Sequence, residues 1–283
     1  MAGEWPWAQL RRTSEARRAA AGYFGHTAHR YASAYHESSA GGHALRARHE
    51  RVLDIIGRPR GRVLDVGCGP GHLAQALFDR GIDVWGVDAT PAMIEACRGR
   101  FAPRPAAHFT VGDATRLAFS DGAFEAAICL GVMDYIPALE AAVRELIRVV
   151  RPGGSVLVSF PNLLSPYAVW KLFVFYPAVA LLRPAYYRVT GRPSAPFRPL
   201  WVTKMQTLRR VVRLMQRCGA AVADVRYYNF NIFLSPVDEL IPPSTLRVLG
   251  RLERLHDSAI KWLGAGFIVR AIKAGGGDAA GRR

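Results

Sequence analysis

The chain has 283 residues, half of them hydrophobic, and a formal net charge of +16. This apolar content excludes a disordered protein, and the length allows one large domain or one domain with a cap. The N-terminal residues lack the apolar core of a signal peptide, and the longest apolar run, Tyr167–Leu182, is short for a membrane-spanning helix. The four cysteines, Cys68, Cys97, Cys129 and Cys218, have no metal-type spacing. We therefore expect reduced thiols, a cytoplasmic protein and no metal site.

The positive charge is concentrated in the middle of the chain. No acidic residue lies between Glu145 and Asp224, a stretch that holds 12 Arg and Lys residues. Such a surface is either simply solvated or selected by an anionic partner. Anionic lipid, nucleic acid and an acidic substrate are the candidate partners.

Short apolar strands alternate with helical patterns from residue 62 onward. The predicted strands are 62–66, 83–87, 107–111, 124–130 and 155–160, and the helices between them are 72–80, 91–100 and 137–150. A helix at 205–217, a strand at 220–230, a helix at 245–263 and a strand at 266–273 follow. The pattern predicts an α/β fold with a Rossmann-like, doubly wound, mostly parallel sheet of seven strands.

The remaining segments interrupt or flank this pattern. We divide the chain into a basic N-terminal segment with a helical lid (1–50), a core (51–160), an aromatic and basic cap insertion (161–203), a C-terminal completion of the sheet with a helical insertion (204–275), and a flexible tail (276–283). The cap insertion combines many prolines and aromatic residues with interleaved arginines. It is either an ordinary hydrophobic cap or a surface that admits an apolar ligand beside an anionic membrane.

The stretch VLDVGCGPGHL, Val63–Leu73, places three glycines where the first strand meets the first helix. In an open α/β sheet this junction is a ligand-binding position, because glycine lets the backbone approach a ligand closely. A dinucleotide-binding loop would need a further glycine at His72. Asp65 precedes the loop, where a carboxylate would repel a phosphate and suit a cationic ligand such as S-adenosyl-L-methionine.

Further motifs follow in chain order: GVDAT after the second strand, VGDAT after the third, AAICLGVMDYI along the fourth, and RVVRPGGSVLVSFPN into the fifth. With VLDVGCGPG, this succession resembles class I S-adenosylmethionine-dependent methyltransferases. It is most similar to the ubiquinone- and menaquinone-type small-molecule enzymes, over about residues 51–160.

The resemblance implies S-adenosyl-L-methionine as the cofactor and gives each motif a role. The expected cofactor-binding residues are Gly67, Cys68, Gly69 and Gly71 around the methionine part, Asp65 beneath its ammonium group, Asp88 on the ribose, Ala89 and Met93 on the adenine, Asp113 and Ala114 at the adenine amino group, and Leu130 and Gly131 closing the pocket. Simpler interpretations remain open, because Asp65, Asp88 and Asp113 could cap loops or helices and Met93 could be core.

The catalytic residues are less defined. Relatives often carry a histidine after the fourth strand, where this chain has Asp134. Asp134 could act as a base or cap the next helix, and we favour the cap. His26 and His29, with Tyr23 and Tyr31, could reach the cofactor from the lid or could simply pack there. Arg46 or Arg48 could pair with the cofactor carboxylate, and we favour Arg46.

The sequence therefore predicts an enzyme that methylates oxygen or carbon of a lipophilic small molecule, such as a quinone precursor, isoprenoid, polyketide or lipid, with peripheral contact to anionic membrane. A nucleic acid methyltransferase is less favoured, because the Asn/Asp-Pro-Pro-aromatic element of amino-directed enzymes is missing from GVMDYIP. A non-catalytic S-adenosylmethionine-binding protein is a third possibility, since a fold alone does not establish catalysis.

Overall fold

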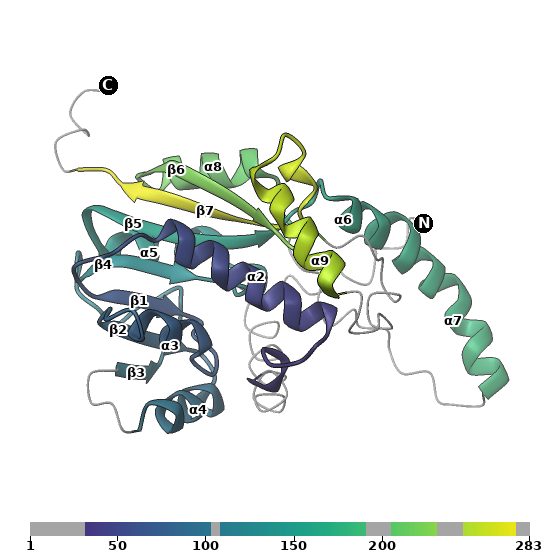
Figure 1. The fold of residues 1–283 in the computed structure, drawn as a ribbon, viewed down its shortest axis with the longest axis horizontal. Coiled ribbons are helices and arrows are strands. Elements are labelled where there is room, and N and C mark those ends of the chain that lie inside the picture. Colours follow the sequence, from purple (N-terminus) through teal and green to yellow (C-terminus); the bar gives the residue numbers. More distant parts are fainter. Residues whose placement is uncertain (1–31, 103–107, 191–204, 231–245, 276–283) are drawn as a thin grey trace.

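The computed structural model describes residues 32–102, 108–190, 205–230 and 246–275 (Figure 1). Within these residues, seven strands form one sheet in the order β3-β2-β1-β4-β5-β7-β6. Strands β1 to β5 are parallel, whereas β7 runs antiparallel to both β5 and β6. The bounds are β1 Val63–Val66, β2 Val84–Asp88, β3 His108–Val111, β4 Phe124–Cys129, β5 Val150–Pro161, β6 Ala220–Tyr228 and β7 Gly266–Lys273. The expected doubly wound α/β sheet is thus confirmed.

Both faces of the sheet are covered by helices, which explains why its strands are apolar throughout. Side chains of successive strand residues point to opposite faces. Leu64 and Val66 accordingly pack with helices α5 (Leu139–Val149) and α8 (Leu208–Arg217), while Val63 packs with the opposite layer. That second layer consists of helices α2 (Ala40–Ile55), α3 (His72–Phe78) and α4 (Pro91–Phe101).

Helix α2 continues through positions 50 and 51, where the sequence suggested the boundary between lid and core. Its start is set by Ser39, whose Oγ accepts a hydrogen bond from the Gly42 amide at 3.1 Å. Val52 and Ile55, near its end, are buried in the layer that covers β1 and β2. The helix therefore belongs to the core at one end, and its other end leads back to the lid segment.

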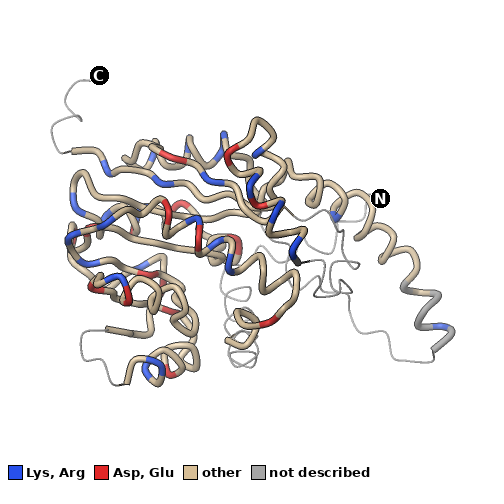
Figure 2. Tube along the Cα trace, in the orientation of Figure 1, with Lys and Arg blue, Asp and Glu red and all other residues tan. Residues whose placement is uncertain are grey.

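A helical arm projects from the body between β5 and β6 (Figure 1). It consists of α6 (Pro166–Trp170), the π-helical turn η2 (Lys171–Phe175) and α7 (Tyr176–Thr190). Its exposed residues include Phe173 at 74% and Leu181 at 79% of their full exposure. Figure 2 shows basic but no acidic positions along this arm. No helix in the described part of the chain combines the length and apolar character needed to cross a membrane.

The segment between β6 and β7 differs from the single helix expected over 245–263. The regular helix α9 covers only Leu246–Leu252 and is followed by 3₁₀ turns at Glu253–Asp257 and Lys261–Leu263. The change occurs where Glu253 turns inward, because its Oε1 accepts a hydrogen bond from the Phe230 amide at 3.1 Å. The side chain of Glu253 is buried there, next to Arg51 of α2.

Candidate functional site

The glycine-rich turn after β1 forms the floor of the candidate site. Gly67, Gly69 and Gly71 all have positive φ, at 74°, 53° and 81°. A side chain at Gly67 would also collide with Val132 after β4, so this position requires glycine for both reasons. The Gly67 amide donates to the Val87 carbonyl at 2.6 Å, which ties the turn to the end of β2.

Cys68 contributes only its backbone to this turn. Its side chain is buried in the layer with α3 and α4, and its Sγ lies 3.9 Å from that of Cys97. Cys97 in turn donates from Sγ to the Gly69 carbonyl at 3.1 Å. Both thiols are free, and they support the turn from below.

Asp65, in β1, is a buried carboxyl with an unused acceptor. Only 3% of the residue is exposed, and its Oδ2 has no hydrogen-bond partner. Burial and the neighbouring Asp88 raise its pKa to about 7, while Arg48 acts in the opposite direction. A buried carboxyl of this kind is stabilised when a cation binds beside it. The arrangement fits the ammonium group of S-adenosylmethionine.

Asp88 ends β2 and links the glycine turn to the start of α4. Its Oδ2 accepts from the Gly69 amide at 3.0 Å, and its Oδ1 accepts from the Thr90 amide at 2.8 Å. Burial raises its pKa, and these backbone donors oppose the increase. The local capping interpretation is therefore present in the geometry. The Thr90 side chain also donates to this carboxylate. These three donors leave part of its acceptor capacity, roughly four lone pairs in all, for the ribose.

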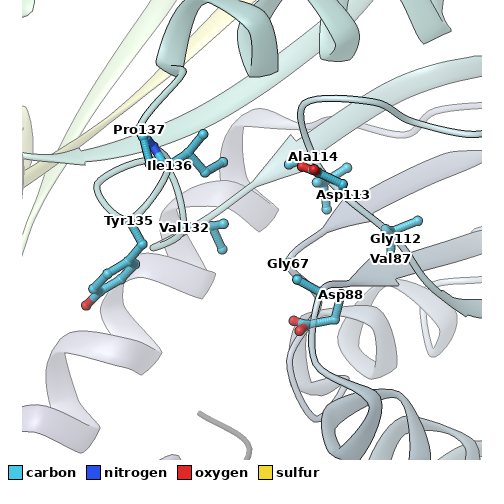
Figure 3. A pocket seen from close by; sticks show the side chains of 12 residues that line it. Gly67, Val87, Asp88, Gly112, Asp113, Ala114, Val132, Tyr135, Ile136 and Pro137 are labelled. Carbon is cyan, nitrogen blue, oxygen red and sulfur yellow. The ribbon is translucent and has the colours of Figure 1, made fainter. Parts of the chain in front are cut away.

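A pocket of about 70 Å³, the smaller pocket, opens at the ends of β1, β2 and β3 (Figure 3). Figure 3 shows Gly67, Asp88 and Ala114 on one side of it and Val132, Ile136 and Pro137 on the other. Its lining is completed by Val66, Val87, Ala89, Gly112, Asp113 and Tyr135.

Of two residues expected to contact the adenine, Asp113 and Met93, only Asp113 lines the smaller pocket. Asp113 lines the smaller pocket, although its Oδ1 also accepts from the Thr115 amide at 2.9 Å in a local turn. Met93 is only 2% exposed and is not among the described residues that line the pocket. The geometry of Met93 therefore matches the core interpretation.

The structure places Arg48, and not Arg46, at the site. The Arg46 guanidinium points away and donates to the carbonyls of Tyr35 and Glu37 at 2.8 and 3.0 Å. Arg48 is 9% exposed and lies directly over Gly131. Because Arg46 already has backbone partners in the lid segment, it is not positioned to receive a cofactor carboxylate.

The loop after β4 adds Leu130, Gly131 and Asp134. Leu130 is buried, and the Gly131 amide donates to Ser159 Oγ at 2.8 Å. Asp134 does not cap helix α5, whose N-cap position is Ala138. Its carboxyl is buried with Oδ1 unpartnered, and burial raises its pKa to about 6 against the effect of Arg48. The helix-capping interpretation favoured from sequence is therefore wrong.

A larger cavity of about 240 Å³ has Arg48 in its lining. It is bounded by α2, α6 and the ends of β5, β6 and β7. Arg48 and Tyr228 line it, and the two side chains are hydrogen-bonded to each other. Tyr228, at the end of β6, was not identified from the sequence. The signal that could have identified Tyr228 is an aromatic hydroxyl at the end of a predicted strand.

The lid histidines His26 and His29, with Tyr23 and Tyr31, lie outside the described residues. The adjoining part of the lid segment contacts the site through Tyr35. Its ring stacks on His72 at 4.1 Å between centroids, and its hydroxyl lies 3.2 Å from His49 Nε2. His72 stands where a dinucleotide-binding loop would have glycine. Here it packs against Tyr35 of the lid segment.

Fold and site together define a class I S-adenosylmethionine-dependent methyltransferase domain. The family described as "Methyltransferase domain" matches residues 64–158, which include most of β1, the glycine turn, Asp88, Asp113 and Asp134. The cofactor of this class is S-adenosylmethionine, in agreement with the ammonium-compatible setting of Asp65.

Individual relatives carry the comparison further. A demethylmenaquinone methyltransferase of Beutenbergia cavernae is 36% identical over 146 residues, which are 51% of this chain and 59% of that protein. A malonyl-(acyl-carrier protein) O-methyltransferase of Serratia marcescens is 35% identical over 111 residues, covering 39% of this chain and 42% of that protein. The chain thus spans about half the length of the curated relatives it matches.

The likeness in fold extends over more of the chain. Magnesium protoporphyrin IX methyltransferase from Synechocystis, solved with bound SAH, has a TM-score of 0.61 at 15% identity. The overlay covers 92% of this chain and 100% of that protein. At this identity the comparison concerns the fold alone.

Proposed function

We propose that this chain is an enzyme that transfers the methyl group of S-adenosylmethionine to oxygen or carbon of a lipophilic small molecule. The observation that carries the proposal is that Arg48 lies beside both parts of the site. Arg48 lines the larger cavity, and it lies close enough to Asp65, which precedes the glycine turn, to lower the pKa of that carboxyl. The smaller pocket opens at the same turn, at Gly67. A group-transfer enzyme needs two adjoining binding sites of this kind.

In this proposal the smaller pocket takes the nucleoside and the glycine turn takes the amino-acid end. Asp88 accepts the ribose hydroxyls, and Ala89 and Ala114 flank the adenine. Asp65 faces the ammonium group. Bound cofactor supplies a methyl group that is already activated by the adjoining sulfonium. The protein's task is then to align the acceptor and exclude water, since proximity alone can supply much of the acceleration.

The larger cavity is the proposed acceptor site. Its wall contains aliphatic and small residues such as Ala44, Leu45, Ala168 and Met205 beside Tyr167. The same lining also carries the polar side chains of Arg48, Asn162, Ser165, Lys171 and Asn229. An apolar wall that also presents placed polar groups is typical of sites for small ligands. One relative is named a demethylmenaquinone methyltransferase, which supports a lipophilic acceptor, and another is named an O-methyltransferase, which supports transfer to oxygen.

We also propose that the helical arm rests on an anionic membrane surface, where apolar acceptors are concentrated. Its exposed apolar residues lie beside basic ones, and the sequence from 146 to 223 contains no acidic residue. Apolar contact combined with basic side chains is the pattern of peripheral membrane binding. The arm borders the larger cavity through Tyr167 and Lys171, so a bound acceptor could enter from the membrane side.

The proposal is tested with methyl-labelled S-adenosylmethionine and three extracts, containing lipids, water-soluble small molecules or RNA. Transfer of label to the lipid extract is the expected result. Transfer to RNA alone would replace the proposal with a nucleic acid methyltransferase. Tight binding of the cofactor without transfer to any extract would indicate a protein that binds S-adenosylmethionine without using it.

A further inference from the structure

The charged side chains in the described lining of the larger cavity are basic. Its charged lining residues are Arg48 and Lys171, and none of the described residues that line it is an aspartate or glutamate. Lys171 lies on η2 with its ammonium 4.7 Å from the centre of the Tyr167 ring, which also lines the cavity. A cation held over an aromatic face keeps a defined position. The described lining of the cavity therefore contains two basic side chains, one on α2 and one on η2.

Arg48 marks the end of the cavity nearest the cofactor side. Its guanidinium covers Gly131 and is hydrogen-bonded to the hydroxyl of Tyr228. Arg48 also acts to lower the pKa of Asp65 and of Asp134, but neither carboxyl is among the described residues that line the cavity. Both carboxyls have a raised pKa. The positive end of the cavity thus faces the place where methyl transfer would occur.

The described lining contains no group suited to remove a proton from an acceptor. It holds no histidine, and its two tyrosines are Tyr167, whose ring lies under the Lys171 ammonium, and Tyr228, whose hydroxyl has a pKa raised by burial. That hydroxyl is also hydrogen-bonded to Ser159 and Arg48. Neutral hydroxyl and activated-carbon acceptors need a base, whereas an acceptor that is already an anion does not.

We propose that the acceptor is an apolar carboxylic acid, bound as its carboxylate by Arg48 and Lys171 and methylated on a carboxylate oxygen. The inference rests on the proposed methyl transfer and specifies its substrate class. A lone pair of the carboxylate oxygen forms the new bond to the methyl carbon. The carbon–sulfur bond breaks and its electron pair stays on sulfur. The products are a methyl ester and S-adenosylhomocysteine, and no proton is transferred.

The two cations must bind the carboxylate and still leave one of its oxygens able to attack the methyl carbon. Arg48 already donates to Tyr228, so its remaining N–H groups can be shared between the acid and its other neighbours. The aliphatic wall formed by Ala44, Leu45 and Ala168 leaves the rest of the acceptor in apolar surroundings. The cavity volume, about 240 Å³, suits the acidic end of a longer molecule that extends through the opening.

The decisive experiment uses the chemistry of the product. Purified full-length protein is incubated with methyl-labelled S-adenosylmethionine and a lipid extract, and the labelled product is then treated with mild alkali. A carboxyl methyl ester releases its label as volatile methanol, whereas methyl ethers, amines and C-methyl groups retain theirs. Release is expected. Retention would overturn the carboxylate inference and leave the proposed methyltransferase intact, whereas no transfer at all would remove both.

Variants test the cavity itself. Lys171→Met is expected to lower kcat/KM for the labelled lipid acceptor at least tenfold, with S-adenosylhomocysteine affinity unchanged by calorimetry. Lys171→Arg, which retains the charge, should restore a large part of the rate. Arg209→Met, which removes an exposed charge of α8 away from the cavity lining, is the matched control. Equal losses in the Lys171→Met and Arg209→Met variants, or none in either, would contradict a role for Lys171 in binding the acid.

Discussion

A methyl group added at Gly131 would overlap the guanidinium of Arg48. Gly131 has a φ of 67°, and its amide is held by Ser159. The turn after β4 is therefore shaped to let an arginine from α2 lie across it. This contact joins a helix that starts in the lid segment to the loop beside the cofactor turn.

Replacing Gly131 with alanine should displace Arg48. We expect Gly131→Ala to reduce methyl transfer more than tenfold, with a stability loss of about 1–2 kcal/mol from the left-handed backbone. Gly81→Ala is the matched control, because Gly81 has a φ of 77° with no atoms near the added group. Transfer rates and thermal unfolding of both variants separate the two effects. If Gly131→Ala is as active as Gly81→Ala, Arg48 does not depend on this contact.

The buried carboxyl of Asp65 predicts pH-dependent cofactor binding. Its pKa is raised to about 7 in the ligand-free protein, so below this pH the carboxyl is mostly protonated. A bound ammonium group favours the ionised form, so binding must release a proton. We expect the affinity for S-adenosylhomocysteine to rise about tenfold per unit from roughly pH 5 to pH 7. Calorimetry in buffers of different ionisation enthalpy measures the proton, and Asp65→Asn should abolish its release.

The same group affects stability without ligand. Because the folded pKa of Asp65 lies above the unfolded value, its contribution is favourable at low pH and is lost as the pH rises through about 7. At about 1.4 kcal/mol per pKa unit, the cost at high pH is up to about 4 kcal/mol. Asp65→Asn should therefore stabilise the ligand-free protein at about pH 8 more than at about pH 4. Denaturant midpoints that shift equally at both values would contradict this.

From the position of Asp88 we expect that its replacement weakens cofactor binding. Asp88→Ala removes the acceptor for the Gly69 and Thr90 amides as well as the proposed ribose contact, so S-adenosylhomocysteine binding should weaken more than tenfold. Asp83→Ala, which removes a half-exposed carboxylate that pairs with Arg62 just before β2, is the control. Calorimetry gives the two affinities and thermal unfolding gives the two stabilities. Unchanged affinity in Asp88→Ala would contradict the ribose-binding role.

Replacing Asp134 distinguishes direct attack by a carboxylate acceptor from base catalysis. If the acceptor is already an anion, Asp134→Asn should retain methyl transfer to within about threefold. The variant should also be more stable than the wild type at about pH 8, because the pKa of Asp134 is raised to about 6 and the wild type bears the cost of a buried charge there. A folded Asp134→Asn protein that has lost about a hundredfold in rate would identify Asp134 as a base.

The helical arm predicts membrane binding that depends on apolar contact. Replacing Phe173 and Leu181 with serine removes two exposed apolar side chains. The partition coefficient on vesicles of phosphatidylglycerol and phosphatidylcholine should fall about a hundredfold or more, since burying each side chain contributes roughly 1.5–3 kcal/mol and about 1.4 kcal/mol is a factor of ten. Ile260→Ser with Trp262→Ser, exposed at 43% and 50%, is the matched control. Equal vesicle sedimentation of both double variants would contradict the proposed contact.

The strands, their parallel core and the glycine turn could be predicted because each depends on local sequence. Apolar runs such as VLDV and the succession of glycines are legible without tertiary information. The place of β7 between β5 and β6 was not predicted, because pairing partners distant in sequence leave no local signal. The end of α9 was missed for a similar reason, since it depends on Glu253 reaching Phe230.

The choice between Arg46 and Arg48 shows where helical spacing could have helped. Gly41, Ala44, Leu45 and Arg48 recur on one face of α2 and line the larger cavity together, whereas Arg46 falls on another face. The capping role expected of Asp134 failed because α5 begins five residues later, at Leu139. Its burial depends on tertiary packing around Arg48, which the sequence alone does not specify.

Because β7 follows β6 in the chain but lies between β5 and β6 in the sheet, the two proposed sites are completed one after the other during synthesis. Strands β1 to β5 and the carboxylates that face the cofactor are all synthesised by residue 161. The larger cavity also needs Tyr228, Ala265 and Gly266, and β6 has no neighbour in the sheet other than β7. A nascent chain therefore possesses all the strands that hold the methyl donor well before the wall that receives the substrate is complete.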